Sequence, residues 1–220
     1  MRGLCSRQVL NKIREFKSGS VFSWRDVAIP RFSAGTVQRA LSRLEAQSKI
    51  KRYSRGMYYL PKETLVGPSR ASDEAVLQKL LLEKRARDQA SFGNERIRIN
   101  RLIPVGATLF YEMALTTQVP VQKSFIAPVR FPGNSKALKV VTVPMEKYQD
   151  LSDSELKSYL ALVSLDKIGN ESSAEVALGF KRFLKINFIS RSCLRDICTR
   201  LGGQKGRKAI RNLEFVFHLN

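Results

Sequence analysis

The apolar positions of the first thirty residues predict two helices separated by a short extended segment. Residues 7–16 carry apolar side chains at helical spacing. Residues 21–22 favour a short strand, and Ser23 is a suitable N-cap for a second helix over residues 24–28. Pro30 is expected to end that helix, because proline disfavours the helical conformation of the residue before it.

A third helix is predicted to begin after Ser33, whose hydroxyl can accept a hydrogen bond from a free backbone amide of the first turn. Its apolar positions form a narrow stripe at Val37, Leu41 and Leu44, which suits packing on two other helices. The opposite face is small, polar or basic, and it holds no acid before Glu45. A solvated helix usually mixes both signs of charge, whereas a helix in the major groove needs small residues and hydrogen-bond donors. The predicted DNA contacts on this helix are Ser33, Thr36, Gln38, Arg39, Ser42 and Arg43.

Residues 49–61 predict a basic β-hairpin. Two short strands, residues 50–53 and 57–60, flank a turn in which Gly56 supplies the backbone freedom that a tight hairpin needs. The predicted contacts to the DNA backbone on this hairpin are Lys51, Arg52 and Arg55. Three helices followed by a basic hairpin are typical of a winged helix-turn-helix, so we expect residues 1–62 to form such a DNA-binding domain.

Beyond the hairpin, the pattern predicts a linker and a second domain. Residues 63–95 contain the linker, around Gly67-Pro68-Ser69, and then a charged helix. The charged segment Lys84-Arg85-Ala86-Arg87 either contacts DNA or is solvated. Residues 96–220 mix strands and helices. We therefore expect an α+β fold class, an N-terminal winged helix-turn-helix followed by a mixed α/β C-terminal domain with terminal helices.

Within residues 96–220 the pattern predicts strands first and helices last. A strand is expected over residues 96–103, where basic and apolar residues alternate, and a short helix is expected to follow Pro104-Val-Gly106 and run through Met113. Two further strands, residues 123–131 and 137–143, are predicted around the turn Pro132-Gly-Asn-Ser. Three helices and an extended piece finish the chain. The helices begin at the capping-box sequences Ser152-Asp-Ser-Glu155 and Ser172-Ser-Ala-Glu175 and at residue 190, and the extended piece covers residues 213–219.

The charge of the chain indicates a polyanionic partner. The 220 residues carry a formal net charge of +20. Residues 1–62 hold 14 Lys and Arg against 3 Asp and Glu, while the other 158 hold 25 against 16. The short N-terminal part thus carries over half of the excess, as expected for double-stranded DNA binding. The open alternatives are a ribosome-associated or merely basic protein, and a basic helical domain that uses the same surface for a protein partner.

The sequence offers no constellation for catalysis or for metal binding. The three cysteines and the single histidine, His218, lack the spacing of a Cys/His zinc finger, and the odd cysteine count argues against a closed disulfide framework. Neither a Walker loop nor an HExxH motif occurs. We therefore expect no enzyme activity, no cofactor and no metal. The chain has no apolar run near the about 20 residues of a membrane span and no signal-peptide pattern, so we expect a cytoplasmic protein without a membrane partner.

Several segments resemble the AbiEi-type antitoxins and their uncharacterised relatives. In the N-terminal part these are Phe22-Ser-Trp-Arg-Asp-Val27, Thr36-Val-Gln-Arg-Ala-Leu-Ser-Arg-Leu44 and Ile50-Lys-Arg-Tyr-Ser-Arg-Gly-Met-Tyr-Tyr-Leu-Pro61. Downstream, Ile103-Pro-Val-Gly-Ala107 and Met113-Ala-Leu-Thr-Thr-Gln-Val-Pro120 are similar to the start of the second domain of that group. The resemblance is continuous over about residues 7–145.

The resemblance implies a transcriptional repressor that binds operator repeats and autoregulates its operon. It also implies a type IV antitoxin, whose C-terminal domain counters a nucleotidyltransferase-like toxin encoded next door without obligate direct binding. The alternative is a stand-alone winged-helix regulator of a mobile element, with a C-terminal domain for oligomerisation or sensing. A nucleotidyltransferase reading frame beside the gene would separate the two hypotheses. By position, the resemblance implies DNA contacts from Thr36, Gln38, Arg39, Arg43, Arg52 and Arg55.

Overall fold

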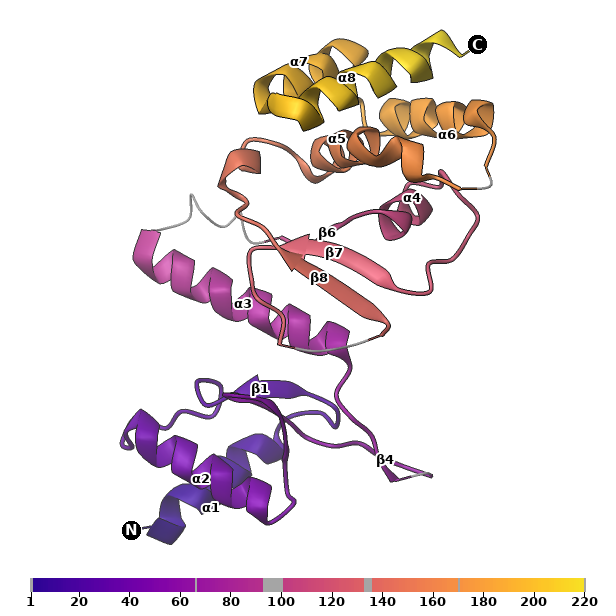
Figure 1. The fold of residues 1–220 in the computed structure, drawn as a ribbon. Coiled ribbons are helices and arrows are strands. Elements are labelled where there is room, and N and C mark those ends of the chain that lie inside the picture. The colour runs from indigo at the N-terminus through magenta and orange to yellow at the C-terminus, as the bar shows by residue number, and fades with distance from the viewer. Residues whose placement is uncertain (1, 66, 93–100, 133–135, 170, 220) are drawn as a thin grey trace. The chain divides into compact units, whose positions relative to one another are not determined.

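The chain folds into two compact units, residues 1–83 and 84–220 (Figure 1). The structure is a computed structural model that describes residues 2–65, 67–92, 101–132, 136–169 and 171–219. Each unit has its own cluster of buried hydrophobic side chains. Helices and small sheets occur together in the chain, so the predicted α+β class is confirmed.

The N-terminal unit combines two packed helices with a three-stranded antiparallel sheet. In chain order its elements are α1 (Arg2–Arg14), β1 (Val21–Ser23), α2 (Ala34–Ala46), β2 (Lys51–Ser54) and β3 (Met57–Tyr59). Strand β3 is central, because the strand order is β1-β3-β2. A miniature hairpin follows, and a long helix crosses into the second unit. These elements are β4 (Glu63–Thr64), β5 (Gly67–Pro68) and α3 (Asp73–Phe92).

The apolar stripe predicted on α2 is confirmed, and it packs in the core of the N-terminal unit. Val37, Leu41 and Leu44 are buried, and Ala40 joins them. They share one hydrophobic cluster with side chains of α1 and of the sheet, including Val9, Ile13, Phe22, Ile50 and Tyr58. The hairpin is also confirmed: Ser54 lies opposite Met57, and Gly56 takes a positive φ of 80° in the turn between them.

The predicted second helix over residues 24–28 is wrong, because residues 24–27 form turns. The Asp26 carboxylate accepts hydrogen bonds from the Ser23 backbone amide at 2.7 Å and from the Ser23 hydroxyl at 3.3 Å. Such local bonds compete with helix formation, and the short interval before Pro30 leaves little room for a costly helical nucleus. The segment still packs, since Val27 is buried and Trp24 is half-buried against the same core.

In the C-terminal unit, a small mixed sheet precedes a group of helices along the chain. The sheet has the order β6-β7-β8, and α4 follows β6 in the chain. Its strands and first helix are β6 (Ile103–Pro104), α4 (Ala107–Glu112), β7 (Lys123–Ala127) and β8 (Leu138–Thr142). The later elements are η2 (Glu146–Tyr148), α5 (Asp153–Ser164), η3 (Leu165–Lys167), α6 (Ser173–Ile186), α7 (Arg191–Leu201) and α8 (Gly203–His218).

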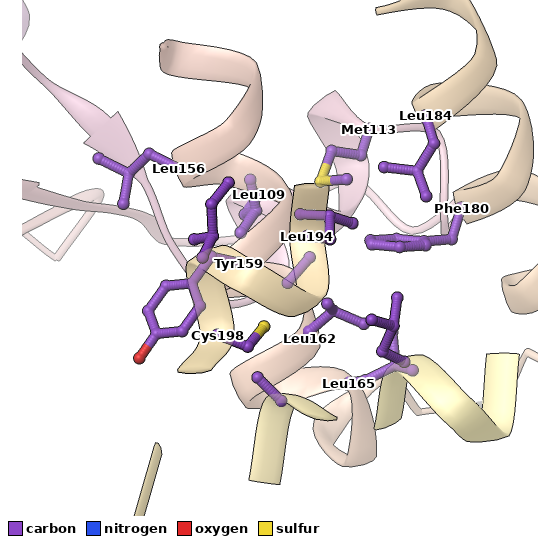
Figure 2. Packing of buried hydrophobic residues seen from close by; sticks show 14 of the residues in the cluster. Leu109, Met113, Leu156, Tyr159, Leu162, Leu165, Phe180, Leu184, Leu194 and Cys198 are labelled. Carbon is purple, nitrogen blue, oxygen red and sulfur yellow. The ribbon is translucent and has the colours of Figure 1, made fainter. Parts of the chain in front are cut away.

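One hydrophobic cluster joins these helices. Figure 2 shows Leu109 and Met113 close to α5, α6 and α7, whose side chains fill the interior from several directions. The labelled members from those three helices are Leu156, Tyr159, Leu162, Phe180, Leu184, Leu194 and Cys198. The unit is therefore stabilised mainly by burial of apolar surface between helices rather than by its short strands.

Two predictions for the strands of this unit need correction. Strands β7 and β8 pair in parallel, from Lys123 opposite Leu138 to Ala127 opposite Thr142, and do not form a hairpin around the predicted turn. Residues 133–135 of that turn lie outside the described residues. Of the strand predicted over residues 96–103, residues 96–100 also lie outside them, and only Ile103 pairs in β6.

The predicted extended piece over residues 213–219 is also wrong, because α8 continues to residue 218. Gly202 and Gly203 have φ values of 54° and 63°, so they end α7 and reverse the chain at once into α8. One face of α8 is buried along its length, at Gly206, Ala209, Leu213 and Val216. This apolar repeat stabilises a helix where a strand was expected.

Helices α5 and α6 both begin with the predicted capping boxes. In α6 the Ser172 hydroxyl accepts from the Glu175 amide at 3.2 Å, and the Glu175 carboxylate accepts from the Ser172 amide at 3.1 Å and from its hydroxyl at 2.7 Å. The hydrogen bonds from the side chain and the backbone of Ser172 lower the pKa of Glu175 below its ordinary value of 4.5.

The acid stability of the chain is expected to depend on this box. Because the pKa of Glu175 is lowered by folding, its stabilisation is present above pH 4.5 and is lost as the pH falls through the folded-state pKa. The substitution Ser172→Ala should lower the melting temperature at pH 7 by about 2 °C, and by less at pH 3. Circular dichroism melts would measure both differences, with the neighbouring exposed Ser173→Ala as control. An equal difference at the two pH values would contradict the linkage.

Gly206 marks a very close approach of α8 to α7. A Cβ atom at this position would lie against the carbonyl oxygen of Cys198, well inside normal contact. Gly206→Ala is therefore expected to destabilise the C-terminal unit by about 1–3 kcal/mol, although alanine is the better helix former. Denaturant unfolding followed by circular dichroism would measure the loss. Gly169→Ala is the control, since a methyl group there meets nothing within 4 Å, and equal stability of the two variants would refute the expectation.

Candidate nucleic-acid interface

The solvent side of α2 gathers all the contact residues that the sequence predicts for this helix. We call it the α2 face, and it comprises Ser33, Gly35, Thr36, Gln38, Arg39, Ser42 and Arg43. All of these are exposed except Thr36, which is half-buried. They lie together because the opposite side of the helix is held in the core. The α2 face therefore presents hydroxyl, amide and guanidinium groups to solvent on a rigid element.

Local hydrogen bonds order the side chains of the α2 face. Ser33 caps the helix by accepting from the Thr36 amide at 3.3 Å, and the two hydroxyls lie 3.0 Å apart. The Arg39 Nε donates to the Gly35 carbonyl at 3.2 Å, and the Ser42 hydroxyl donates to the Gln38 carbonyl at 3.2 Å. Arg39 forms no ion pair with any residue that the structure describes, so the other N–H donors of its guanidinium remain available to a ligand.

The β2–β3 hairpin lies beside the C-terminal end of α2. Arg55 is exposed in the turn, next to Gly56, and Lys51 is half-buried at the start of β2. Arg52 connects the hairpin to the helix, because its Nε lies 3.3 Å from the Glu45 carboxylate. The same guanidinium donates to the Tyr58 hydroxyl at 3.0 Å and lies 5.4 Å from the centroid of that ring.

Arg52 has a structural role that the sequence does not predict. The sequence predicts a phosphate contact for Arg52, as for Lys51 and Arg55, whereas in the structure its guanidinium also contacts Glu45 and Tyr58. An exposed ion pair of this kind contributes little stability. Its consequence is electrostatic and geometric, since it neutralises the acid of α2 and orients the hairpin against the helix. The sequence feature that could have indicated this ion pair is that Glu45 is the only acidic residue of α2.

Other acidic side chains of the N-terminal unit form ion pairs and hydrogen bonds at or near α3. Asp26 pairs with Lys79, and Lys79 also lies 3.6 Å from Glu83. Arg25 extends the network to Glu83 at 3.9 Å. At the first residue of α3, the Asp73 carboxylate accepts from the Tyr53 hydroxyl. Burial, together with this hydrogen bond, raises the pKa of Tyr53 to about 12.

The chain matches one protein family over residues 8–186, and that family is described as a family of unknown function (DUF6088). The match covers more than half of the chain. The chain belongs to this family. No curated protein matches the chain. In this DUF6088 chain the matched residues include the α2 face and the β2–β3 hairpin, and the match ends where α6 ends. Helices α7 and α8 lie beyond it.

The C-terminal unit contains a hollow lined by several polar side chains. Its polar lining is Asp150, Glu155, Ser190, Ser192, Cys193, Asp196 and Arg200. The Cys193 thiol donates to the Glu155 carboxylate at 3.5 Å, and burial raises the pKa of this thiol, which keeps it protonated at neutral pH. All three cysteines are free. Within the described ranges, no three His, Cys, Asp or Glu side chains gather to hold a metal, and no helix is long and apolar enough to cross a bilayer.

Proposed function

We propose that the chain binds double-stranded DNA through its N-terminal unit, used as a winged helix-turn-helix. In this proposal α2 is the recognition helix and the β2–β3 hairpin is the wing. The order of elements, α1, β1, α2, β2 and β3, supports it, as does the sheet order β1-β3-β2. The turns over residues 24–27 stand where a short middle helix is usual in such domains.

One observation carries the proposal: none of the residues of the α2 face is acidic. Glu45, the acid at the end of the helix, is neutralised by Arg52 from the hairpin. An anionic duplex therefore meets donors and cations along the whole exposed side of α2. An ordinary protein-binding surface has no need for a single sign of charge, which makes DNA the better partner than a protein on this surface.

The proposal gives each side chain a role that follows from its geometry. Arg39 and Gln38, on the exposed middle of α2, are placed to reach base edges in the major groove. Ser33 and Thr36, at the helix N-terminus, suit a phosphate that approaches the first backbone amides. Further contacts to phosphates come from Ser42, Arg43, Lys51 and Arg55. Arg52 holds the wing in place while it retains exposed donors of its own.

Single substitutions should separate base reading from phosphate binding. Arg39→Ala is expected to cost about 1–3 kcal/mol on a duplex selected from a random pool and to relax the base preference at one position. Arg55→Ala should weaken selected and random duplexes alike and lower the salt slope by about one. Fluorescence anisotropy with both duplexes would measure these changes.

The control for these variants is Lys167→Ala, which removes one exposed cation from the C-terminal unit. It should leave the binding of both duplexes nearly unchanged. Equal losses of affinity for selected and random DNA in Arg39→Ala would contradict the base-reading role of Arg39. Unchanged binding for every α2-face variant would refute the DNA proposal itself.

A narrower form of the proposal is an autoregulating antitoxin. It is supported by the resemblance of residues 7–145 to AbiEi-type antitoxins. The chain would repress its own operon through the N-terminal unit and counter a nucleotidyltransferase-like toxin through the C-terminal unit. A stand-alone regulator of a mobile element is the alternative, and the absence of a toxin gene next door would favour it.

The antitoxin form predicts that repression and protection are separable. The double variant Arg39→Ala/Arg55→Ala should lose repression of a promoter–reporter fusion but still protect cells against the induced toxin. Protection that disappears together with repression, at matched protein levels, would reject the modular antitoxin.

A further inference from the structure

The division into two units changes where the positive charge of the chain lies. Residues 1–83 hold 16 Lys and Arg against 7 Asp and Glu, because the first turns of α3 bring acids to the N-terminal unit. Residues 84–220 hold 23 against 12, so the larger excess belongs to the C-terminal unit. DNA binding by the α2 face and the wing therefore does not account for the larger part of the net charge, which lies in the C-terminal unit.

Much of this excess lies on the last two helices. Residues 191–218 contain seven Lys and Arg against two acids. Glu214 pairs with Arg191 and lies 3.6 Å from Arg195, and Lys208 pairs with Asp166 of η3 at 2.7 Å. Arg200 faces the polar hollow, where its charge helps to lower the pKa of Glu155. Three cations, Lys205, Arg207 and Arg211, form no ion pair with a residue that the structure describes.

Two of these cations, Arg207 and Arg211, form one exposed surface with Gln204, which we call the α8 row. Gln204, Arg207 and Arg211 follow one another at helical spacing, opposite the buried face at Gly206, Ala209 and Leu213. Gln204, Arg207 and Arg211 also line a shallow hollow together with Ile210. Helix α8 packs against α7 and α5 in the same unit (Figure 1), so the row is carried by a rigid element.

The charges of the α8 row form no ion pair with a described residue that would stabilise the fold. The start of α8 is also basic, because it has no acid in its first turn and no side-chain cap, and Lys205 in that turn opposes the helix macrodipole. Helices α5 and α6 in the same unit have an acid in the first turn and a capping box. Side chains that add charge to a helix without a structural gain indicate a functional requirement.

We propose that the α8 row is a second DNA-binding surface, which holds the phosphate backbone of a duplex without reading its bases. Guanidinium groups suit phosphate oxygens through paired hydrogen bonds, and the row offers two of them with the amide donor of Gln204. The proposal shares its ligand with the proposed function but uses none of the same residues.

Other polyanions fit the α8 row less well. An amphipathic membrane helix needs an exposed apolar face, whereas the apolar face of α8 is buried. Among the described residues of α8, Phe215 is the only large apolar side chain that is exposed. Single-stranded nucleic acid is usually held on several stacked aromatic rings, and a single ring does not provide such a platform. The evenly spaced phosphates of a duplex need only cations and donors along one face.

The test compares two double variants of the full chain that remove the same charge. Arg207→Gln/Arg211→Gln removes two cations of the α8 row, and Arg182→Gln/Lys185→Gln removes two exposed cations of α6. Affinity for a random-sequence 30-base-pair duplex would be measured by fluorescence anisotropy from about 50 to 200 mM salt. The α8 double variant should lose about tenfold or more in affinity and lower the salt slope by about two, while the α6 double variant changes little.

Folding and partner identity are checked in the same experiment. The melting temperature of the α8 double variant should be nearly unchanged, because Arg207 and Arg211 are exposed and form no ion pair with a described residue. Identical affinities and slopes for the two double variants would overturn the proposal, and so would an intact chain that binds no duplex. Stronger binding to a single-stranded RNA probe, lost in the α8 variant, would reject the duplex in favour of RNA.

The two proposals fail in different ways. If variants of the α2 face leave duplex binding intact while the α8 double variant weakens it, the N-terminal proposal is wrong and the α8 row stands. The reverse pattern rejects the α8 row alone.

Discussion

Leu41→Ala is expected to destabilise the N-terminal unit by about 2–5 kcal/mol, the range for a buried leucine truncated to alanine. Leu41 is fully buried on the core side of α2, between Val37 and Leu44. Its loss leaves a cavity beneath the helix that carries the α2 face. DNA binding should therefore weaken with it, although Leu41 contacts no ligand.

The unfolding of this unit can be followed separately from the rest of the chain. Trp24 is the only tryptophan, and it packs half-buried against the N-terminal core. Its fluorescence during denaturant unfolding therefore reports residues 1–83, while far-ultraviolet circular dichroism follows both units. Separate probes are needed because two units need not unfold in a single two-state transition.

Two matched substitutions test the specificity of this effect. Leu65→Ala makes the same change at a fully exposed side chain in the β4–β5 turn, so it should shift stability by less than about 0.5 kcal/mol. Leu162→Ala makes the same change in the core of the C-terminal unit, and it should not shift the unfolding transition that Trp24 fluorescence reports. A Leu41 variant that unfolds at the same denaturant concentration as the Leu65 variant would contradict the core assignment.

The elements that could be predicted from sequence are those whose cause is local. Ser33 and the apolar stripe of α2 specify that helix within a few residues, and the structure confirms both. Gly56 does the same for the hairpin turn, and the capping-box residues do so for α5 and α6. In each case a side chain bonds a nearby backbone group or the apolar period is unambiguous.

The elements that could not be predicted depend on distant partners or on competing local bonds. The parallel pairing of β7 with β8 is a choice of register between strands, which the turn between them does not determine. The last helix was missed because two consecutive glycines suggest an end, whereas their positive φ angles begin α8. The ion pair of Arg52 with Glu45 joins separate elements, so no pattern within either of them predicts it.

The candidate site shows the same division. The sequence was sufficient to place the α2 face, because exposure and burial alternate along one helix. It was not sufficient to place the α8 row, since the sequence pattern predicts an extended piece over residues 213–219 and the charge balance favours the N-terminal part. Only the boundary at residue 83 shows that the C-terminal unit carries the larger excess.

Binding of the intact chain to duplex DNA is expected to fall about 1,000-fold between 50 and 200 mM salt, the loss for a protein that makes roughly six phosphate contacts. The α2 face with the wing and the α8 row together provide about that number of cations. Cations of the α2 face and the wing are Arg39, Arg43, Lys51 and Arg55, and those of the α8 row are Arg207 and Arg211. Each phosphate that is neutralised releases counterions from the duplex, so the slope of log affinity against log salt should be about −5.

The salt slope also distinguishes this mechanism from a loss of structure. Both cores are apolar, and exposed ion pairs contribute little to stability, so circular dichroism should not change over the same salt range. A slope shallower than about −2 would show that few phosphates are contacted and that the basic surfaces serve another ligand. Arg39→Ala/Arg55→Ala and Arg207→Gln/Arg211→Gln should each remove part of the slope, and because they lie in different units their effects should add.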